Sequence, residues 1–208
     1  MASARSRDVA FLVLLAAPGM AMADLIVAQA EPLARASGAE PELVAQYGRL
    51  QRRLVASARA ARDSADAARR FTAVVYSAAA EIGPGAGDVM RRNLLAERGV
   101  FTSAAYRDLL AADPVPALRR VRVPVLALNG TLDRQVPAAE NLAAVRAALA
   151  AGGNRDHTET ALGGLNHLFQ TARTGLPVEY GAIEETVAPA ALDAVTAWVV
   201  ARFAGARR

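Results

Sequence analysis

The chain has 208 residues, of which 53% are hydrophobic, and its mean hydropathy is +0.19; this composition can form a buried core and excludes a disordered protein. Cysteine is absent and only two histidines occur, which excludes disulfides and thiolate metal sites and leaves little for a histidine-based metal cluster. All 24 basic residues are arginine, and the formal net charge is +4. We therefore expect one domain, or a core with a lid, that needs neither metal nor cofactor.

The first apolar segment, residues 8–17, has two interpretations. Its aliphatic run without polar alternation is typical of a strand buried on both faces of a parallel sheet, and Pro18-Gly19 would form the turn after it. Alternatively, residues 1–23 are a secretory signal peptide, because residues 1–7 are basic and Ala21-Met22-Ala23 resembles a cleavage site. The run is too short to span a bilayer. The strand interpretation is favoured; it goes with a cytoplasmic location, whereas a signal peptide would mean secretion.

Residues 24–110 are expected to form a helical insertion. From Glu42 to Ala80 the only glycine is Gly48 and there is no proline, and apolar residues such as Leu50 and Leu54 recur at helical spacing. The arginines of this stretch can be interpreted as a phosphate-binding stripe or as a solvated helix face balanced by acidic residues. Without interleaved aromatic residues or a known motif, the solvated face is favoured and no nucleic-acid partner is expected.

The end of this insertion contains a glycine-rich segment and a further helix. The segment Gly83–Gly87 lacks the preceding strand and the Lys-Ser/Thr pair of a phosphate-binding loop, so it is expected to be a turn between helices. Residues 101–113 are expected to be the last helix, with Thr102 or Ser103 as its capping residue.

A second strand is predicted over residues 122–129. It is short, apolar and rich in β-branched residues, and Asn129-Gly130 ends it in a turn that places Asp133 just beyond its carboxyl end. Pro137 suits the start of a helix. Apolar residues at helical spacing continue this helix until Gly152-Gly153.

The third predicted strand, residues 157–162, leads into a glycine-containing loop that presents His167. Asp133 and His167 are 34 positions apart, which is enough for one helix and one returning strand. Their side chains are therefore expected at the same edge of a parallel sheet, where sites form in open α/β folds. His157 opens the third strand and is assigned no role, and residues 190–203 are expected to form a closing helix.

Two segments of the sequence, one around Asp133 and one around His167, resemble a known enzyme family. The run from Asn129 to Pro137 and the run from Gly164 to Phe169 resemble the carboxyl-terminal portion of α/β-hydrolase-fold enzymes, in the branch of serine aminopeptidases, esterases and dienelactone hydrolases. In that family the chain order of the catalytic residues is Ser, then Asp or Glu, then His, with the serine in a G-x-S-x-G turn. The resemblance implies that Asp133 is the acid and His167 the general base of such a triad.

The same resemblance implies a fold. It is a partial α/β-hydrolase fold with about three parallel strands (8–17, 122–129 and 157–162) flanked by helices. Residues 1–23 and 111–208 would form the core, and residues 24–110 a helical cap. Phe101 and Tyr106 are the aromatic residues expected to contact substrate.

The nucleophile is missing from this pattern. None of the serines has glycine two residues before and two residues after it, as a nucleophile elbow requires: Ser3, Ser6, Ser37, Ser57, Ser64, Ser77 and Ser103. The chain is therefore expected to be inactive alone.

Two hypotheses about function remain. In the first, the chain is part of an enzyme that hydrolyses a small ester, amide or peptide, and the serine belongs either to an amino-terminal portion of the same protein or to a separate partner chain. In the second, it is a non-catalytic interaction protein derived from the hydrolase fold. In either case the uncovered edge of the first strand is expected to pair with a partner or with a second copy.

Overall fold

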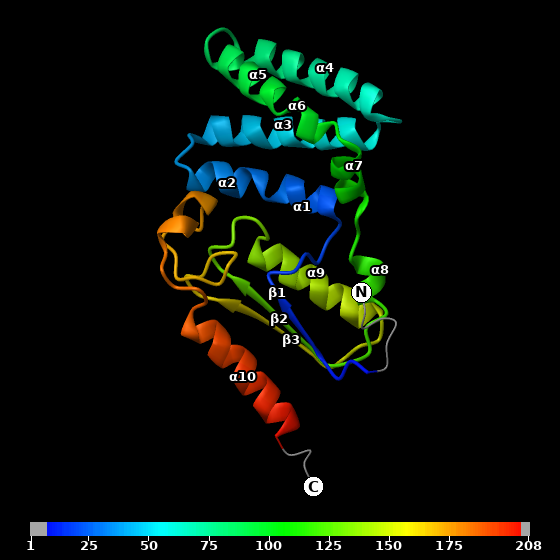
Figure 1. Ribbon diagram of the computed structural model, residues 1–208, viewed down its shortest axis with the longest axis vertical. Coiled ribbons are helices and arrows are strands. Elements are labelled where there is room, and N and C mark those ends of the chain that lie inside the picture. The colour runs from blue at the N-terminus through cyan, green and yellow to red at the C-terminus, as the bar shows by residue number, and fades with distance from the viewer. Residues whose placement is uncertain (1–7, 205–208) are drawn as a thin grey trace. The chain divides into compact units, whose positions relative to one another are not determined.

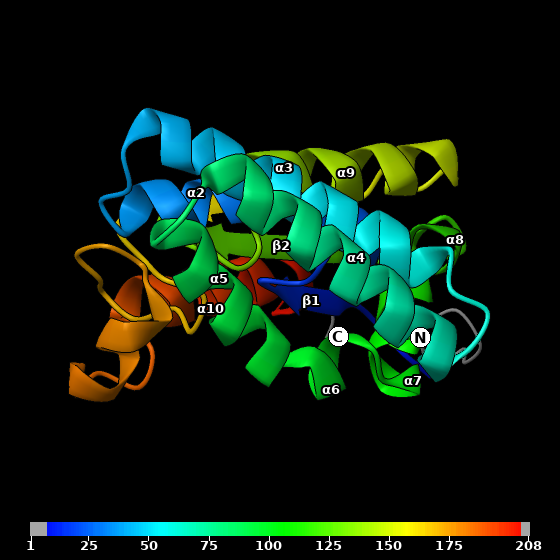
Figure 2. The same cartoon turned by 90° about the horizontal axis from the view of Figure 1, so that it is seen from above.

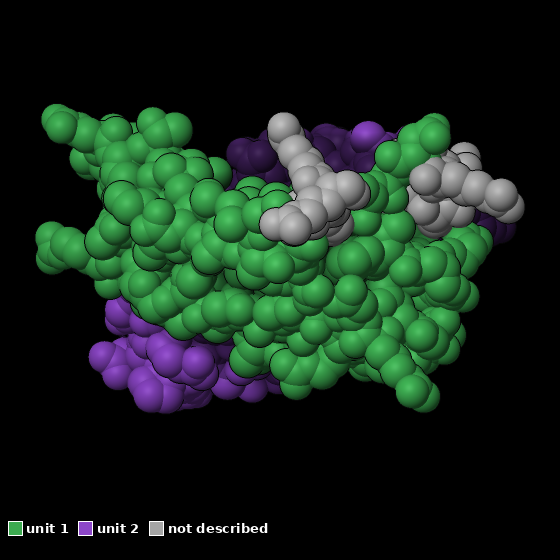
Figure 3. All heavy atoms as spheres, turned by 90° about the horizontal axis from the view of Figure 1, so that it is seen from below, with its two compact units in different colours: residues 1–20, 113–208 green, residues 21–112 purple. Residues whose placement is uncertain are grey.

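The computed structural model describes residues 8–204, and these form an α/β structure with a helical insertion. The chain divides into two compact units, coloured separately in Figure 3: unit 1 comprises residues 1–20 and 113–208, and unit 2 comprises residues 21–112. These boundaries differ by a few residues from the expected core and cap. The basic segment 1–7 of the signal-peptide alternative lies outside the described residues.

Unit 1 contains a three-stranded sheet of β1 (Leu12–Leu15), β2 (Val125–Gly130) and β3 (His157–Leu162), in the order β1-β2-β3 and parallel throughout. The predicted three parallel strands are therefore confirmed. All six residues of the central strand β2 are buried, as its apolar sequence predicts for a strand covered on both faces. Among the described residues, no strand pairs with the outer side of β1.

β1 is shorter than predicted and β2 begins later than predicted, whereas β3 has its predicted bounds. Pro124 has no N–H to donate and directly precedes β2, so the ladder begins with Leu12 opposite Val125. The Leu12 N–H donates to the carbonyl of Pro124 at 2.9 Å. Residues 8–11 consequently have no β2 residue opposite them, and β1 is confined to four residues instead of the predicted 8–17.

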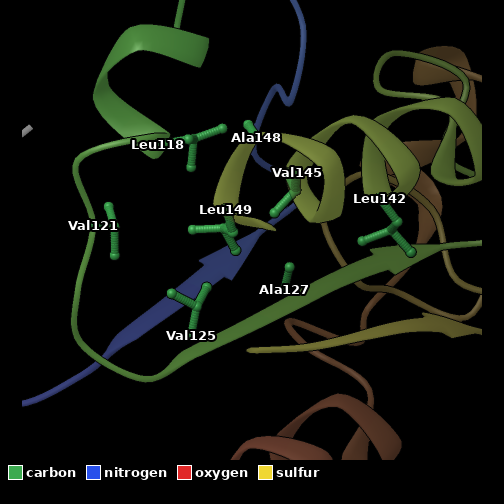
Figure 4. Packing of buried hydrophobic residues seen from close by; sticks show 8 residues of the cluster. All are labelled: Leu118, Val121, Val125, Ala127, Leu142, Val145, Ala148 and Leu149. Atoms are coloured by element: carbon green, nitrogen blue, oxygen red, sulfur yellow. The ribbon is translucent and has the colours of Figure 1, made fainter. Parts of the chain in front are cut away.

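One face of the sheet is covered by α9 (Ala138–Ala151) and by the short α8 (Val115–Leu118). Figure 4 shows Val145 and Leu149 of α9 above Val125 and Ala127 of β2. Leu149 and Val125 are fully buried. This apolar contact holds α9 against the sheet, while the parallel ladder between β2 and β3 brings the carboxyl ends of those two strands side by side.

The opposite face is covered by α10 (Pro189–Phe203), as Figure 1 shows. Ala191 and Val195 pack against the buried Leu126 and Leu128 of β2. The indole N–H of Trp198 donates to the hydroxyl of Thr158 at 3.3 Å. The only tryptophan of the chain is therefore half-buried against the core of unit 1 and reports on its folding.

Unit 2 is entirely helical. Its α3 lies between a layer formed by α1 and α2 and a layer formed by α4 and α5 (Figures 1 and 2). Leu50, Leu54, Phe71 and Val75 form the largest apolar contact between α3 and α4. The helices of the unit are α1 (Met22–Ala28), α2 (Ala30–Ala36), α3 (Pro41–Arg59), α4 (Ser64–Ile82), α5 (Ala86–Ala96), α6 (Arg98–Phe101) and α7 (Ala104–Ala111).

Two long helical stretches of the sequence are divided in the structure. The first division separates α3 from α4. Asp63 caps the start of α4, because its carboxylate accepts the N–H of Asp66 at 2.7 Å. Ser103 caps α7 in the same way, accepting the N–H of Tyr106 at 3.1 Å, so residues 101–113 are not one continuous helix. The turn predicted at Gly83–Gly87 separates α4 from α5. No helix within residues 8–204 is both long and apolar enough to cross a membrane.

Candidate acid–base site

Asp133 lies in a tight turn directly after β2. Its Oδ1 accepts the backbone N–H groups of Gln135 and Val136 at 2.9 and 2.8 Å, the pattern by which an aspartate stabilises its own turn. The buried Asn129 spans the same turn, since its side-chain amide donates to the carbonyl of Val136 at 3.0 Å. The carboxylate is thus held in one orientation, with Oδ2 left for another partner.

His167 lies in a loop that is organised by Asn166. The Asn166 side chain is fully buried, and its oxygen accepts the N–H groups of Leu168 and Gln170. Phe169 has a φ of 59°, a left-handed conformation that is uncommon outside glycine. Its buried ring packs in the cluster beneath α10. The loop is therefore tied down immediately after His167.

Asp133 and His167 are brought together as the spacing of the sequence predicts. His167 Nδ1 lies 2.9 Å from Asp133 Oδ2. A carboxylate only accepts hydrogen bonds, so Nδ1 donates here, and in the neutral imidazole Nε2 has the lone pair. The carboxylate side chain has no exposed surface, whereas the imidazole is 28% exposed. A buried acid thus orients a base whose other nitrogen is available to react.

A glycine at the end of β2 makes this approach possible. A Cβ on Gly130 would lie 2.1 Å from the carbonyl oxygen of Leu165 and 2.8 Å from that of Asn166. Any side chain at this position would push the histidine loop away from the strand. The N–H of Leu132 donates to the same Leu165 carbonyl at 2.9 Å, so the two loops are joined through their backbones.

Several residues that the sequence did not indicate also contact the aspartate turn. The guanidinium of Arg134 donates to the carbonyl of Thr174 at 3.0 Å, and the side-chain amide of Gln135 donates to the hydroxyl of Tyr180 at 3.1 Å. Tyr180 lies in the 3₁₀ helix η2 (Pro177–Ala182). These contacts join residues 40 and 45 positions apart, which no local pattern in the sequence reveals.

Each of the described serines makes a hydrogen bond within unit 2. Ser57 donates to the carbonyl of Leu54, and Ser77 donates to the carboxylate of Glu81. Ser37 donates to a helix carbonyl, Ser64 accepts from Arg107, and Ser103 caps α7. None of these five hydroxyls has a histidine as hydrogen-bond partner, and Ser3 and Ser6 lie outside the described residues.

Phe101 and Tyr106, the predicted substrate contacts, lie together in unit 2. Their rings meet edge to face at 5.4 Å, and Phe101 also stacks on Phe71 at 5.6 Å. Both rings line a pocket of about 250 Å³ whose wall has no charged residue. Burial raises the pKa of the Tyr106 hydroxyl, which has no hydrogen-bond partner. The rings are part of the helical packing, and their contact with substrate stays a prediction.

The other histidine has a different environment. His157 Nδ1 lies 2.6 Å from the buried carboxylate of Glu159, which also pairs with Arg146 at 3.0 Å. This group lies at the start of β3, opposite the end that leads to His167. Within residues 8–204, no three histidine or acidic side chains gather in a way that would hold a metal ion.

Comparisons with protein-family models, curated proteins and solved structures find no match for this chain. The candidate site is therefore defined by its geometry alone.

Proposed function

We propose that this chain supplies the acid and the base of a serine-type hydrolase that cleaves carboxylic ester or amide bonds. The nucleophilic serine would come from a polypeptide segment outside these 208 residues. The observation that carries the proposal is the hydrogen bond between the fully buried Asp133 carboxylate and the partly exposed His167 imidazole. The resemblance of the surrounding sequence to α/β-hydrolases supports the same assignment.

In the proposed reaction, His167 Nε2 takes the proton of the serine hydroxyl as that oxygen attacks the carbonyl carbon of the substrate. Nδ1 stays protonated and bonded to Asp133, whose negative charge stabilises the imidazolium that forms. The imidazolium then returns its proton to the leaving alcohol or amine. Water repeats the cycle to release the acid and regenerate the serine.

The edge of β1 is where we propose that the missing segment pairs. Leu15 is 53% exposed, although it belongs to an apolar strand, and a parallel neighbour would cover it and continue the sheet. An unpaired strand edge of this kind binds other strands readily. The same edge also favours the second candidate, a non-catalytic protein that uses β1 to bind a partner or a second copy.

A fluorophosphonate probe, which reacts with activated serines, separates these candidates. We expect no labelling of the purified 208-residue chain. The tagged chain is then isolated from its native cells together with whatever is bound to it. We expect labelling of a serine on the added polypeptide or on an upstream extension of this chain, reduced about 10³-fold or more by His167→Ala.

His157→Gln is the matched control, because His157 also has a carboxylate partner but lies at the other end of β3. We expect labelling to survive this substitution. Labelling of one of the seven serines of the purified chain would contradict the proposal, as would labelling of the complex that persists in His167→Ala. Stable association without any labelled serine would favour the non-catalytic candidate.

A further inference from the structure

The segment from Thr174 to Tyr180, here called the supporting segment, contacts the residues on both sides of Asp133. It is the orange part of the chain in Figure 1, after the histidine loop. Its Gly175 lies against Leu132, and its Thr174 carbonyl accepts from Arg134. Its Tyr180 hydroxyl accepts from Gln135. The neighbours of the aspartate are therefore held by a segment about 40 residues further along the chain.

The contact with Leu132 is the closest of the three. Gly175 has a φ of +76°, and a Cβ there would lie 1.7 Å from the Leu132 carbonyl oxygen. Only glycine combines this backbone conformation with such proximity. The supporting segment thus packs backbone to backbone against the start of the aspartate turn.

The supporting segment is itself stabilised by Glu179. Its carboxylate accepts the N–H of Gly175 at 2.6 Å and that of Thr174 at 3.3 Å. Burial opposes the charged form, yet these backbone hydrogen bonds keep the pKa of Glu179 below its ordinary value. These hydrogen bonds within the supporting segment give its loop a defined conformation.

Tyr180 is the residue of this segment whose side chain contacts the aspartate turn. Besides the bond from Gln135, its hydroxyl lies 3.5 Å from the Gly175 carbonyl oxygen, to which it can donate. The backbone of His167 lies near the same hydroxyl. Burial raises the pKa of Tyr180, and the nearby Asp133 raises it further, so the hydroxyl stays protonated and can both donate and accept.

We propose that Tyr180 is a positioning residue for the Asp133–His167 pair, because its hydroxyl accepts a hydrogen bond from the turn that carries the acid and lies near the backbone of the loop that carries the base. Its hydrogen bonds are with Gln135 and Gly175, not with the carboxylate or the imidazole. Loss of the hydroxyl would free the Gln135 side chain and loosen the turn that holds Asp133. The distance between Asp133 Oδ2 and His167 Nδ1 would then fluctuate more widely. This role rests on the proposed function, for which the pair must be formed.

The test uses histidine labelled with ¹⁵N in the whole chain, which contains only two histidines; His157→Gln assigns their signals. In the unaltered chain, we expect His167 to be a single tautomer with a slowly exchanging proton on Nδ1. In Tyr180→Phe, we expect this proton to exchange with solvent about fivefold faster, the factor that loss of one ordinary hydrogen bond allows. Trp198 fluorescence should remain native, which shows that unit 1 is folded.

Tyr76→Phe is the matched control, because Tyr76 lies in α4 and is 51% exposed; we expect no change in His167. Gln135→Leu removes the donor from the other side of the same hydrogen bond. It should reproduce the effect of Tyr180→Phe, and the double substitution should add little to either. Gln135→Leu also decides the question if Tyr180→Phe fails to fold.

The outcomes distinguish this inference from the proposed function. An Nδ1 proton that exchanges within about twofold of the unaltered rate in Tyr180→Phe or in Gln135→Leu would overturn the role of Tyr180 alone. Absence of the Nδ1-protonated tautomer in the unaltered chain would mean that the pair itself is not formed. That result would overturn both proposals.

Discussion

Two substitutions of Asp133 separate its structural role from its electrostatic role. Asp133→Asn keeps the oxygen that accepts the N–H groups of Gln135 and Val136, but it replaces the charged acceptor of the His167 proton by an amide. Asp133→Ala removes all three interactions. The comparison is sharp because the aspartate side chain has no exposed surface, so water does not replace the lost acceptor without a rearrangement of the turn.

The magnitude follows from the groups left without a partner. In Asp133→Ala, the N–H of the buried Val136 has no acceptor, which costs about 1 to 3 kcal/mol, and the bonds of Gln135 and His167 are lost at about 1 kcal/mol each. In Asp133→Asn only the bond to His167 is lost, at about 1 to 2 kcal/mol. We therefore expect the free energy of unfolding of unit 1 to be about 2 kcal/mol lower in the alanine variant than in the asparagine variant.

Trp198 fluorescence during urea unfolding is the appropriate assay, because this single tryptophan is half-buried against the core of unit 1. A two-unit chain need not unfold in one step, and the fluorescence follows only the unit that contains Asp133. Equal destabilisation by both substitutions would refute the reasoning, since it would mean that the two backbone hydrogen bonds contribute nothing. No loss of stability in Asp133→Ala would refute the stabilisation assigned to the hydrogen bonds of this carboxylate.

Two further predictions concern stability. Gly175→Ala should destabilise unit 1 by about 2 to 4 kcal/mol, because Gly175 has a left-handed φ and an added Cβ would clash with the Leu132 carbonyl. Gly181→Ala is the control and should be nearly neutral, because the space around a Cβ at this position is open. Similar urea midpoints for the two variants would contradict the close approach of Gly175 to Leu132. In α4, hydrogen bonds from the backbone of Arg62 and the side chain of Arg70 lower the pKa of Asp66 from 3.8 to about 2. This stabilisation of unit 2 is present above about pH 4 and is lost as the pH falls toward 2. Helical circular dichroism should show this loss, and Asp66→Asn should reduce the pH dependence of unfolding; an unchanged profile in that variant would exclude Asp66 as its source.

The sequence predicted the sheet and the position of the pair because both depend on local signals. The apolar run of β2 and the Asn129-Gly130 turn place Asp133, and the glycines after β3 place His167. The parallel direction follows from the helix between the two strands, which returns the chain to the same end of the sheet. Strand length was predicted less well, since the start of β1 depends on the residue opposite it in β2.

The contacts that hold the pair were not predictable in this way. Asn166, Gly175 and Tyr180 read as ordinary loop residues, because loop sequences favour asparagine and glycine for many unrelated reasons. The break between α3 and α4 was also missed. Its signal, the capping aspartate Asp63, is weak beside the helical periodicity on either side.

By itself, the sequence determined that an aspartate and a histidine follow neighbouring parallel strands and that no serine in the chain has the context of a nucleophile elbow. Those conclusions follow from residue types and short-range spacing. Only the tertiary structure decided that the Asp133 carboxylate is fully buried, that it lies 2.9 Å from His167, and that Tyr180 contacts the aspartate turn through Gln135. Such contacts link residues dozens of positions apart, and their existence depends on how the folded backbone closes around the site.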